Sequence, residues 1–280
     1  MQFTNRVAVI TGGASGIGRA LASAMGTRDI AAVALVDMSS NIVDVAAEIN
    51  AEAGRKFAVP FQGNTTDEDF RRSVFDSMAA EHGPVSLCVP AAGITRDDLA
   101  VRVDKHSGKA RIYPQEEFKL VIDVNLIAPV YWALEMIARI AEDRAAKGLK
   151  RWQADEEVQG SVVFIGSISS QGNRGQISYA STKAGLEGAA ATIMKEAIFH
   201  GVRCGVIHPG FTDTPMVRAM GADYVAKNIL PFTQLGRLRD SARGDRRRDL
   251  LHARQLGRER RALGRRRLAR PGLTPPWPEA

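Results

Sequence analysis

The stretch Val7-Ala8-Val9-Ile10-Thr11-Gly12-Gly13-Ala14-Ser15-Gly16-Ile17-Gly18 decides the fold of this chain. An apolar run ends in a turn with the pattern T-G-x-x-x-G-x-G, and a helical pattern follows. Gly12 permits a tight turn, Gly16 lets backbone approach a pyrophosphate, and Gly18 allows close packing of helix on strand. Backbone N–H groups at the helix start then face the phosphates. The residues expected to contact a bound dinucleotide are Thr11, Gly12, Ser15, Gly16, Ile17 and Gly18.

Apolar runs and helical patterns alternate along the chain after this stretch. The predicted strands are Val7–Thr11, Ala31–Val36, Phe57–Phe61, Val85–Val89, Ser161–Ile165 and Val202–Ile207. The predicted helices are Gly18–Gly26, Asn41–Ala53, Asp67–His82, Pro114–Lys147 and Ser178–His200. Uniformly apolar strands are typical of sheets that helices cover on both faces. The alternation predicts an α/β, Rossmann-like, doubly wound parallel sheet in a single domain.

Composition and charge agree with a globular chain of one domain. Of the 280 residues, 45% are hydrophobic and 25% charged, which is ordinary for such a protein. Cys88 and Cys204 lie in apolar runs, so we expect buried thiols, no disulfide and no metal site. Neither a signal segment nor an apolar stretch of 18 residues is found, and the cytoplasm is the expected location.

The last part of the chain differs from the rest. We divide the sequence into a dinucleotide-binding domain, residues 1–238, and an Arg/Pro-rich tail, residues 239–280. Residues 237–280 hold 14 of the 38 Lys and Arg but only 5 of the 31 Asp and Glu, and this tail sets the formal charge of +7.

Three interpretations of the tail remain open. The first is a solvated, disordered segment. The second is a nucleic-acid-binding arm, which the lack of aromatic residues before Trp277 disfavours. The third, which we favour, is a frameshift product: in a shifted frame, codons for residues 242–267 can spell a helix followed by a strand.

Asp37 ends the second predicted strand, about 20 residues after the glycine loop, where a carboxylate accepts hydrogen bonds from adenosine ribose hydroxyls. It also repels a 2′-phosphate. NAD is therefore the expected cofactor and NADP the less favoured one, although Arg19 and Arg28 lie near enough in sequence to favour NADP.

Tyr179 and Lys183 are four residues apart and share one face of a predicted helix. A neighbouring ammonium and a positively charged nicotinamide both favour the phenolate, which predicts a lowered pKa for Tyr179 and acid–base work. Ser167 ends the fifth predicted strand and supplies a hydroxyl to hold a substrate oxygen. His208 also ends an apolar run, and we interpret it as a structural histidine.

Taken in order, these motifs resemble the short-chain dehydrogenase/reductase family over residues 3–238. The motifs that carry the resemblance are Thr11–Gly18, Ala92-Gly93, Asn125 in D-V-N-L, Ser167, Tyr179-x-x-x-Lys183 and Pro209-Gly210. The resemblance implies a catalytic tetrad of Asn125, Ser167, Tyr179 and Lys183. In it, Tyr179 is the acid/base, Ser167 positions the substrate oxygen, Lys183 binds the nicotinamide ribose, and Asn125 holds a water.

The resemblance also implies further cofactor contacts. Asn64 and Thr65 would flank the adenine, and Ala92 and Gly93 would lie beside the cofactor. After Pro209 and Gly210, Thr214 would contact the carboxamide, and Thr212 would lend its backbone.

Several positions depart from the family pattern. Pro90-Ala91-Ala92-Gly93 replaces N-N-A-G, so an asparagine that ties strands together is missing. Insertions stand near Asp104–Tyr113, which we expect to border the substrate cleft, and near Arg144–Val158. The gap from Ser167 to Tyr179 is one residue short, which leaves Ser169 as an alternative to Ser167. The family's seventh strand and its helix are absent from the sequence.

The sequence thus predicts an NAD(P)-dependent oxidoreductase that interconverts a secondary alcohol and a ketone. Gly172–Gln176 resembles 3-oxoacyl-carrier-protein reductases, which gives an NADPH-dependent alternative. A dinucleotide-binding protein whose activity is impaired by the altered C-terminus is the third possibility. We expect a small-molecule alcohol or ketone substrate, a homodimer or homotetramer, and no metal, nucleic acid or membrane partner.

Overall fold

The computed structural model describes residues 3–233 and 238–240 of the chain. They belong to one compact unit, Met1–Ala242, while a second unit, Arg243–Ala280, lies outside the described residues. The interpretation of the tail therefore concerns residues that are almost all outside the described part. Of that tail, Arg239–Asp240 form a short strand, β10, which pairs in parallel with β9 (Thr212–Asp213).

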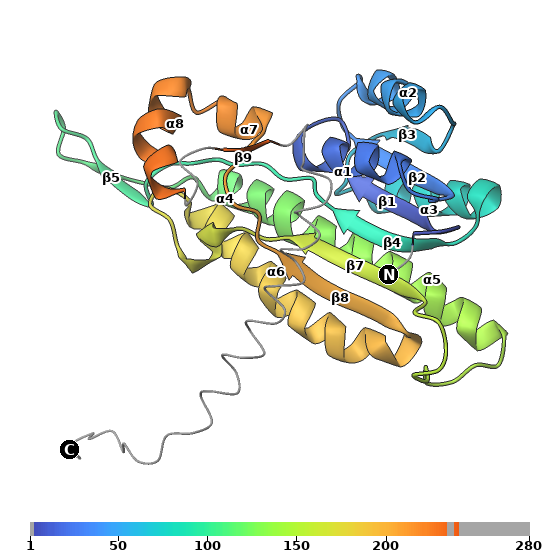
Figure 1. Cartoon of the computed structure of the whole chain (residues 1–280). Coiled ribbons are helices and arrows are strands. Elements are labelled where there is room, and N and C mark those ends of the chain that lie inside the picture. Colours follow the sequence, from blue (N-terminus) through green and yellow to red (C-terminus); the bar gives the residue numbers. More distant parts are fainter. Residues whose placement is uncertain (1–2, 234–237, 241–280) are drawn as a thin grey trace, which may run out of the picture. The chain divides into compact units, whose positions relative to one another are not determined.

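A six-stranded parallel sheet forms the centre of the unit (Figure 1). Its order is β3-β2-β1-β4-β7-β8, so the sheet grows outward in both directions from the β1–β4 pair. The strands are β1 (Val7–Thr11), β2 (Ala32–Asp37), β3 (Ala58–Gln62), β4 (Val85–Pro90), β7 (Gly160–Ile165) and β8 (Val202–Ile207). Ligands bind such sheets where the strand order reverses, which here is the crevice between β1 and β4.

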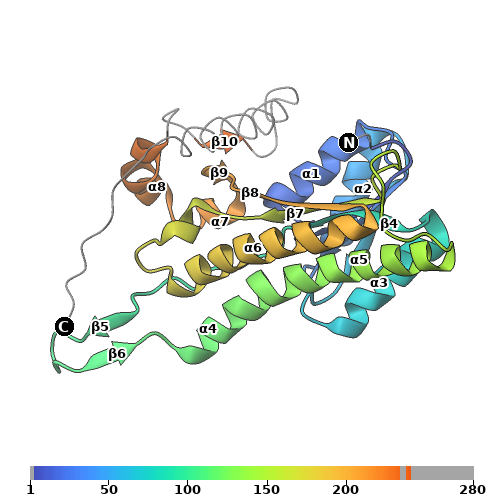
Figure 2. The ribbon, with the colours of Figure 1, turned by 90° about the horizontal axis from the view of Figure 1, so that it is seen from below.

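Helices cover both faces of this sheet, as expected. They are α1 (Gly16–Gly26), α2 (Ile42–Ala53), α3 (Glu68–His82), α4 (Gln115–Ile122), α5 (Ala128–Ala146) and α6 (Ile177–Glu196). Successive side chains of β1 enter different cores: Val7 and Val9 join the cluster with α3, α5 and α6, whereas Ala8 and Ile10 join the one with α1 and α2. Figure 2 shows α5 and α6 side by side on the first of these faces.

The predicted helix Pro114–Lys147 is one long helix, Gln115–Ala146, with a π-helical turn, Asp123–Ile127, between α4 and α5. Its apolar composition meets the length and hydropathy criteria for a membrane span, with a mean hydropathy of 1.6 over the best 18 residues. The sequence reasoning had found no such stretch. In the fold the same residues serve the core, because Trp132, Ala133 and Met136 are fully buried against the sheet.

The chain between β4 and α4 forms a hairpin that the sequence reasoning did not predict. Its strands β5 (Val101–Val103) and β6 (Ala110–Ile112) pair antiparallel, and Figures 1 and 2 show the hairpin extending away from the sheet. Each strand is three residues long with an arginine at its centre, so neither has an apolar run. After β8, the short helices α7 (Pro215–Arg218) and α8 (Ala222–Asn228) were also missed.

The insertion near Arg144–Val158 is fastened to α5 by a buried ion pair. The Arg144 guanidinium is 2% exposed, and it donates to both carboxylate oxygens of Glu156, at 2.6 and 3.2 Å, and to the carbonyl of Lys150 at 3.0 Å. This bidentate contact turns a long connection into an ordered segment. Arg144 is therefore a structural residue.

Strand β8 lies at one edge of the sheet, and among the described residues it pairs only with β7. Arg203, Gly205 and Ile207 on one face of β8 are exposed, and the Ile207 side chain is 49% exposed. The prediction that a seventh strand and its helix are absent concerns residues that lie almost entirely outside the described part.

Both cysteines are free thiols; Cys88 is buried as predicted, whereas Cys204 is only partly buried. Cys88 is in register with Val162, and Val162 with Cys204, so one strand separates them. Burial raises the pKa of Cys88 far above its usual value and that of Cys204 to about 11. Neither thiol is a ready nucleophile.

Candidate active site

The glycine loop has the geometry that its sequence predicts. Gly12 has a φ of +69°, and a Cβ there would lie 2.8 Å from backbone atoms of Ala92. A Cβ on Gly18 would lie 2.3 Å from the carbonyl oxygen of Gly12. A side chain on Gly12 would push the loop away from the segment after β4, and a side chain on Gly18 would push the start of α1 away from Gly12. The first turn of α1 carries no acidic side chain, so its N–H groups form a cradle that fits a pyrophosphate.

Asp37, at the end of β2, faces this loop. Its Oδ2 accepts from the Ala14 N–H at 3.1 Å and its Oδ1 from the Ser39 N–H at 3.0 Å. Each carboxylate oxygen keeps a further lone pair for a ribose hydroxyl. Arg19 is engaged elsewhere, because its guanidinium lies 2.6 Å from Glu48 on α2.

Thr11 supplies the connection that the missing asparagine was expected to make. Its hydroxyl accepts from the Ala92 N–H at 3.1 Å, and its carbonyl accepts from the Ala91 N–H, also at 3.1 Å. The segment after β4 is thereby fixed beside the glycine loop, with Gly93 next to Asn125.

Asn125 lies in the π-helical turn and is fully buried. Its side-chain amide bonds both backbone groups of Ile94, accepting from the N–H and donating to the carbonyl, each at 2.8 Å. These two bonds use one N–H and one lone pair of the amide and fix Asn125 to the segment after β4. That Asn125 holds a water stays a prediction.

Ser167 and Tyr179 are brought together at the carboxyl end of β7. The Ser167 side chain lies close enough to the Tyr179 hydroxyl to lower its pKa, while its Oγ accepts from the Ser169 N–H at 3.1 Å. Ser169, the alternative, instead donates its hydroxyl to Gln176 at 2.9 Å. The structure therefore favours Ser167 over Ser169 as the hydroxyl that acts with Tyr179.

Lys183 lies one turn after Tyr179 on α6, and its Nζ is 5.4 Å from the centre of the Tyr179 ring. It is 5% exposed and donates to the Ile165 carbonyl at 2.8 Å. Burial lowers the pKa of Lys183 to about 8 from 10.5, since the ammonium has lost most of its hydration.

The expected lowering of the Tyr179 pKa is not found in the chain alone. Burial raises the pKa of Tyr179, the Ser167 hydrogen bond lowers it in part, and the charge of Asp97 raises it further. Removal of the phenol from water is the largest of these effects, so the neutral form is favoured. The prediction rested on neighbouring positive charges, whereas burial of the phenol has the largest effect on its pKa.

The remaining predicted residues surround the same crevice. Asn64 and Thr65 follow β3, and the neighbouring Gly63 N–H donates to the Asp37 carbonyl at 2.9 Å. Thr214 lies against the glycine loop, since a Cβ on Gly16 would be 3.4 Å from its methyl group. Pro209 and Gly210 connect β8 to β9, which contains Thr212.

A polar network beside Tyr179 was not predicted from the sequence. The buried Gln176, at the start of α6, accepts from Ser169 and from Asn173, each at 2.9 Å, and donates to Asp97 at 2.8 Å. It joins the segment after β4 to the loop after β7, the two segments that flank Tyr179. A glutamine three residues before the tyrosine was the only sequence signal for it.

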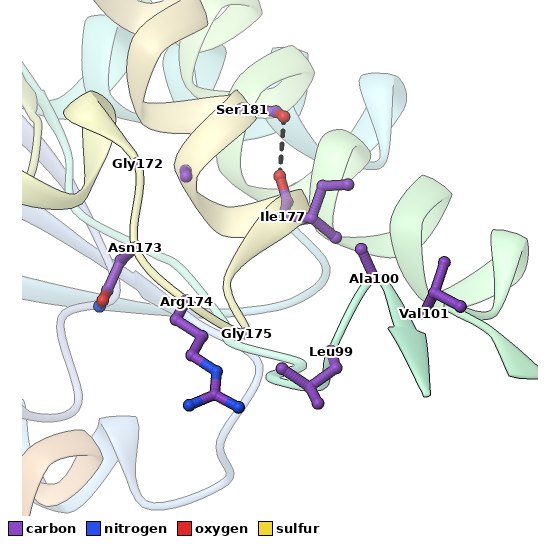
Figure 3. Close-up of a pocket in the computed structure, with 10 residues that line it drawn as sticks. Leu99, Ala100, Val101, Gly172, Asn173, Arg174, Gly175, Ile177 and Ser181 are labelled. Carbon is purple, nitrogen blue, oxygen red and sulfur yellow. Dashed lines mark hydrogen bonds between the residues drawn. The ribbon is translucent and has the colours of Figure 1, made fainter. Parts of the chain in front are cut away.

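A cavity of about 530 Å³ lies beside the site, on another face of α6 (Figure 3). It is lined by Leu99, Ala100, Val101, Gly172, Asn173, Arg174, Gly175, Ile177, Ala180 and Ser181. Tyr179 and Lys183 are not among these residues, because they project from the helix toward the sheet. That the insertion near Asp104–Tyr113 borders the substrate cleft stays a prediction. Among the described residues, no cluster of three or more His, Cys, Asp or Glu could hold a metal ion.

Comparisons with known proteins agree with this geometry. A family model described as short chain dehydrogenase matches residues 6–225. The 3-oxoacyl-[acyl-carrier-protein] reductase FabG of Escherichia coli (strain K12) is 30% identical over 239 residues, which are 85% of this chain and 86% of that protein. Acetoacetyl-CoA reductase of Cupriavidus necator is 28% identical over 237 residues, 84% of this chain and 86% of that protein.

A solved structure extends the likeness to three dimensions. A short-chain type dehydrogenase/reductase from Mycobacterium marinum matches with a TM-score of 0.71 and 26% identity, over 86% of this chain and 85% of that one. Together, the matched family model, the relatives and the parallel sheet with its glycine loop show that this chain belongs to the short-chain dehydrogenase family and is an NAD(P)-dependent oxidoreductase acting on CH–OH groups.

Proposed function

We propose that the protein interconverts a secondary alcohol and a ketone with NAD(H), and that Tyr179 is its acid/base. The observation that carries this proposal is the joint placement of Tyr179, Ser167 and Lys183 at the end of β7. The bound nicotinamide supplies or accepts the hydride. The chain's own residues bind the substrate oxygen and move its proton.

In reduction, the neutral Tyr179 donates its proton to the ketone oxygen while Ser167 donates a hydrogen bond to the same atom. The raised pKa of Tyr179 keeps the phenol protonated at neutral pH, which suits the role of acid. In oxidation, Tyr179 must first lose its proton, and a positively charged nicotinamide nearby would offset the effect of burial. Asn125 would hold a water that continues the proton relay.

The proposed preference for NAD rests on Asp37. Its carboxylate is held toward the glycine loop by Ala14 and Ser39, and a 2′-phosphate there would meet a negative charge at short range. The Arg19 guanidinium, which might offset this repulsion, is paired with Glu48.

A second candidate is the reduction of a 3-oxoacyl thioester, which the names of the two relatives favour. We would assay acetoacetyl-CoA and a panel of simple ketones and secondary alcohols, each with NADH or NADPH (NAD or NADP for oxidation). The absorbance of the reduced cofactor reports turnover. Faster turnover of acetoacetyl-CoA with NADPH would replace the first proposal by the second. Cofactor binding without turnover of any substrate would contradict both and favour the binding-protein alternative.

We also propose that the protein acts as a homo-oligomer. Ile127, Tyr131 and Leu134 are 40–50% exposed, and their spacing places them in one stripe along the long helix. Water-exposed apolar stripes of this kind mark contacts between protein surfaces. A second copy could cover the stripe by presenting the same one, as two-fold symmetry requires.

A further inference from the structure

His208 contacts the backbone that carries Ser167. It follows β8, and its Nδ1 lies 3.0 Å from the carbonyl oxygen of Ser167. The ring also fills the space beside Gly166, where a Cβ would lie 2.7 Å from Nδ1. The Gly166 N–H donates to Ile207 at 2.8 Å, so β7 and β8 are still paired where the imidazole meets them.

The other ring nitrogen of His208 faces a carboxylate. Nε2 lies 3.7 Å from Oε1 of Glu187 on α6, and this oxygen is buried with no hydrogen-bond partner. Since a carbonyl oxygen only accepts, the Nδ1 atom must carry the proton in its contact with Ser167. The Glu187 oxygen lies beyond hydrogen-bond distance of Nε2, so the Nδ1–H contact with the Ser167 carbonyl is the hydrogen bond that orients the ring.

The same short segment is held from its other end by a residue of the proposed tetrad. Lys183 donates to the carbonyl of Ile165, and His208 to the carbonyl of Ser167, two residues later. The Ser167 hydroxyl is thereby placed against Tyr179 by two side chains that hold its backbone. A displacement of about 1 Å in such a group lowers turnover by up to about a hundredfold.

We propose that His208 is a positioning residue: its Nδ1–H holds the Ser167 carbonyl so that the Ser167 hydroxyl stays within reach of Tyr179. The proposal rests on the roles proposed for Ser167 and Tyr179. His208 is not an acid or base in the reaction, because its nitrogens face a backbone carbonyl and Glu187. The interpretation of His208 as a purely structural residue is thereby replaced by one with a kinetic consequence.

The first test compares three variants of the full chain. His208→Ala removes the donor, His208→Asn keeps an N–H donor at a similar distance from the backbone, and His200→Ala removes a histidine packed on Phe199 at the far end of α6. We expect His208→Ala to lower kcat for ketone reduction about 10- to 100-fold, with the Kd for NADH changed less than about twofold. The kcat of His208→Asn should lie within about threefold of the wild-type value, and the kcat of His200→Ala should equal the wild-type value.

The second test needs no substrate. Since the Ser167 hydrogen bond lowers the pKa of Tyr179, His208→Ala should shift the Tyr179 titration to higher pH, as Ser167→Ala does, while His208→Asn should not. Tyrosinate absorbance reports the titration, and Tyr179→Phe identifies its contribution among the four tyrosines. An unchanged titration in His208→Ala, or equal losses of kcat in the Ala and Asn variants, would overturn the proposal. Normal turnover in Ser167→Ala or Tyr179→Phe would instead refute the proposed function.

Discussion

The ammonium of Lys183 donates to the backbone carbonyl of Ile165 across 2.8 Å, in a position where it is only 5% exposed. This lysine, proposed to act with Tyr179, keeps its charge at a cost in folding free energy. Its pKa of about 8, against 10.5 in water, corresponds to roughly 3 kcal/mol of destabilisation at neutral pH.

Lys183→Met should therefore stabilise the fold while it abolishes activity. At about pH 7 we expect the free energy of unfolding to rise by about 2 kcal/mol, because the loss of the bond to Ile165 offsets part of the gain. Between about pH 8 and pH 10.5 the unfolded chain binds more protons than the folded wild type, so wild-type stability rises with pH there. The advantage of the variant should shrink across that window. Urea denaturation without cofactor measures it, and a variant less stable than wild type at neutral pH would contradict this prediction.

Tyr179→Phe should lower turnover by at least about 10²-fold, the effect of removing a positioned proton-transfer group, while NADH binding persists. Ser167→Ala should also impair turnover, and Ser169→Ala serves as its matched control because the Ser169 hydroxyl bonds Gln176 and not Tyr179. Steady-state kinetics with NADH titrations separate the two effects. A larger loss in Ser169→Ala than in Ser167→Ala would reverse the assignment of the two serines.

Asp37→Ala should narrow the preference for NAD over NADP, because it removes the negative charge that a 2′-phosphate would meet. Asp44→Ala, on the first turn of α2, is the control for loss of one acidic charge in this half of the domain. The comparison is kcat/KM with each cofactor at fixed substrate. If the wild type prefers NADP, Arg19 or Arg28 outweighs the carboxylate and the assignment fails.

Glu156→Ala should destabilise the protein more than the loss of a surface pair does, since it leaves the buried guanidinium of Arg144 without its carboxylate. The nearby pair of Lys147 and Asp143 is exposed, so Asp143→Ala should change stability by less than about 1 kcal/mol. Thermal and urea unfolding of both variants give the comparison. Equal effects would mean that the Arg144 contact carries no more weight than a surface pair.

Tyr131→Glu should weaken self-association by placing a charge in the apolar stripe of the long helix. Tyr224→Glu alters another exposed tyrosine, 54% exposed on α8, and serves as the control. Sedimentation velocity should show a smaller species for the first variant only. A wild-type monomer at micromolar concentration would rule out the proposed oligomer.

The sequence predicted the sheet and most of its helices because the strands are apolar runs between recognisable turns. Boundaries such as Ala31–Val36 against Ala32–Asp37 differ by one residue, which is the usual uncertainty of helix and strand ends. The hairpin escaped notice because Arg102 and Arg111 interrupt its short strands, and both arginines pair with Asp98. Such a contact depends on tertiary placement and leaves no period in the sequence.

The site was predictable to the extent that its residues have fixed spacings. Tyr179 and Lys183 are four apart on one helix, and the glycine loop is continuous in sequence. What could not be predicted were the bonds between distant segments, such as Asn125 with Ile94 or His208 with Ser167. The direction of the Tyr179 pKa also depended on burial, which only the folded chain reveals.

The sheet that ends at β8 has one more consequence. Its order β3-β2-β1-β4-β7-β8 comprises two three-stranded halves that meet between β1 and β4. In sheets of this kind each half binds one nucleotide of the dinucleotide. Both halves are complete by Ile207, before β9 begins. Among the described residues, this platform is complete at Ile207 and the predicted cofactor contacts end at Thr214, so sequence changes after Thr214 can alter assembly or the substrate cleft and leave dinucleotide affinity intact.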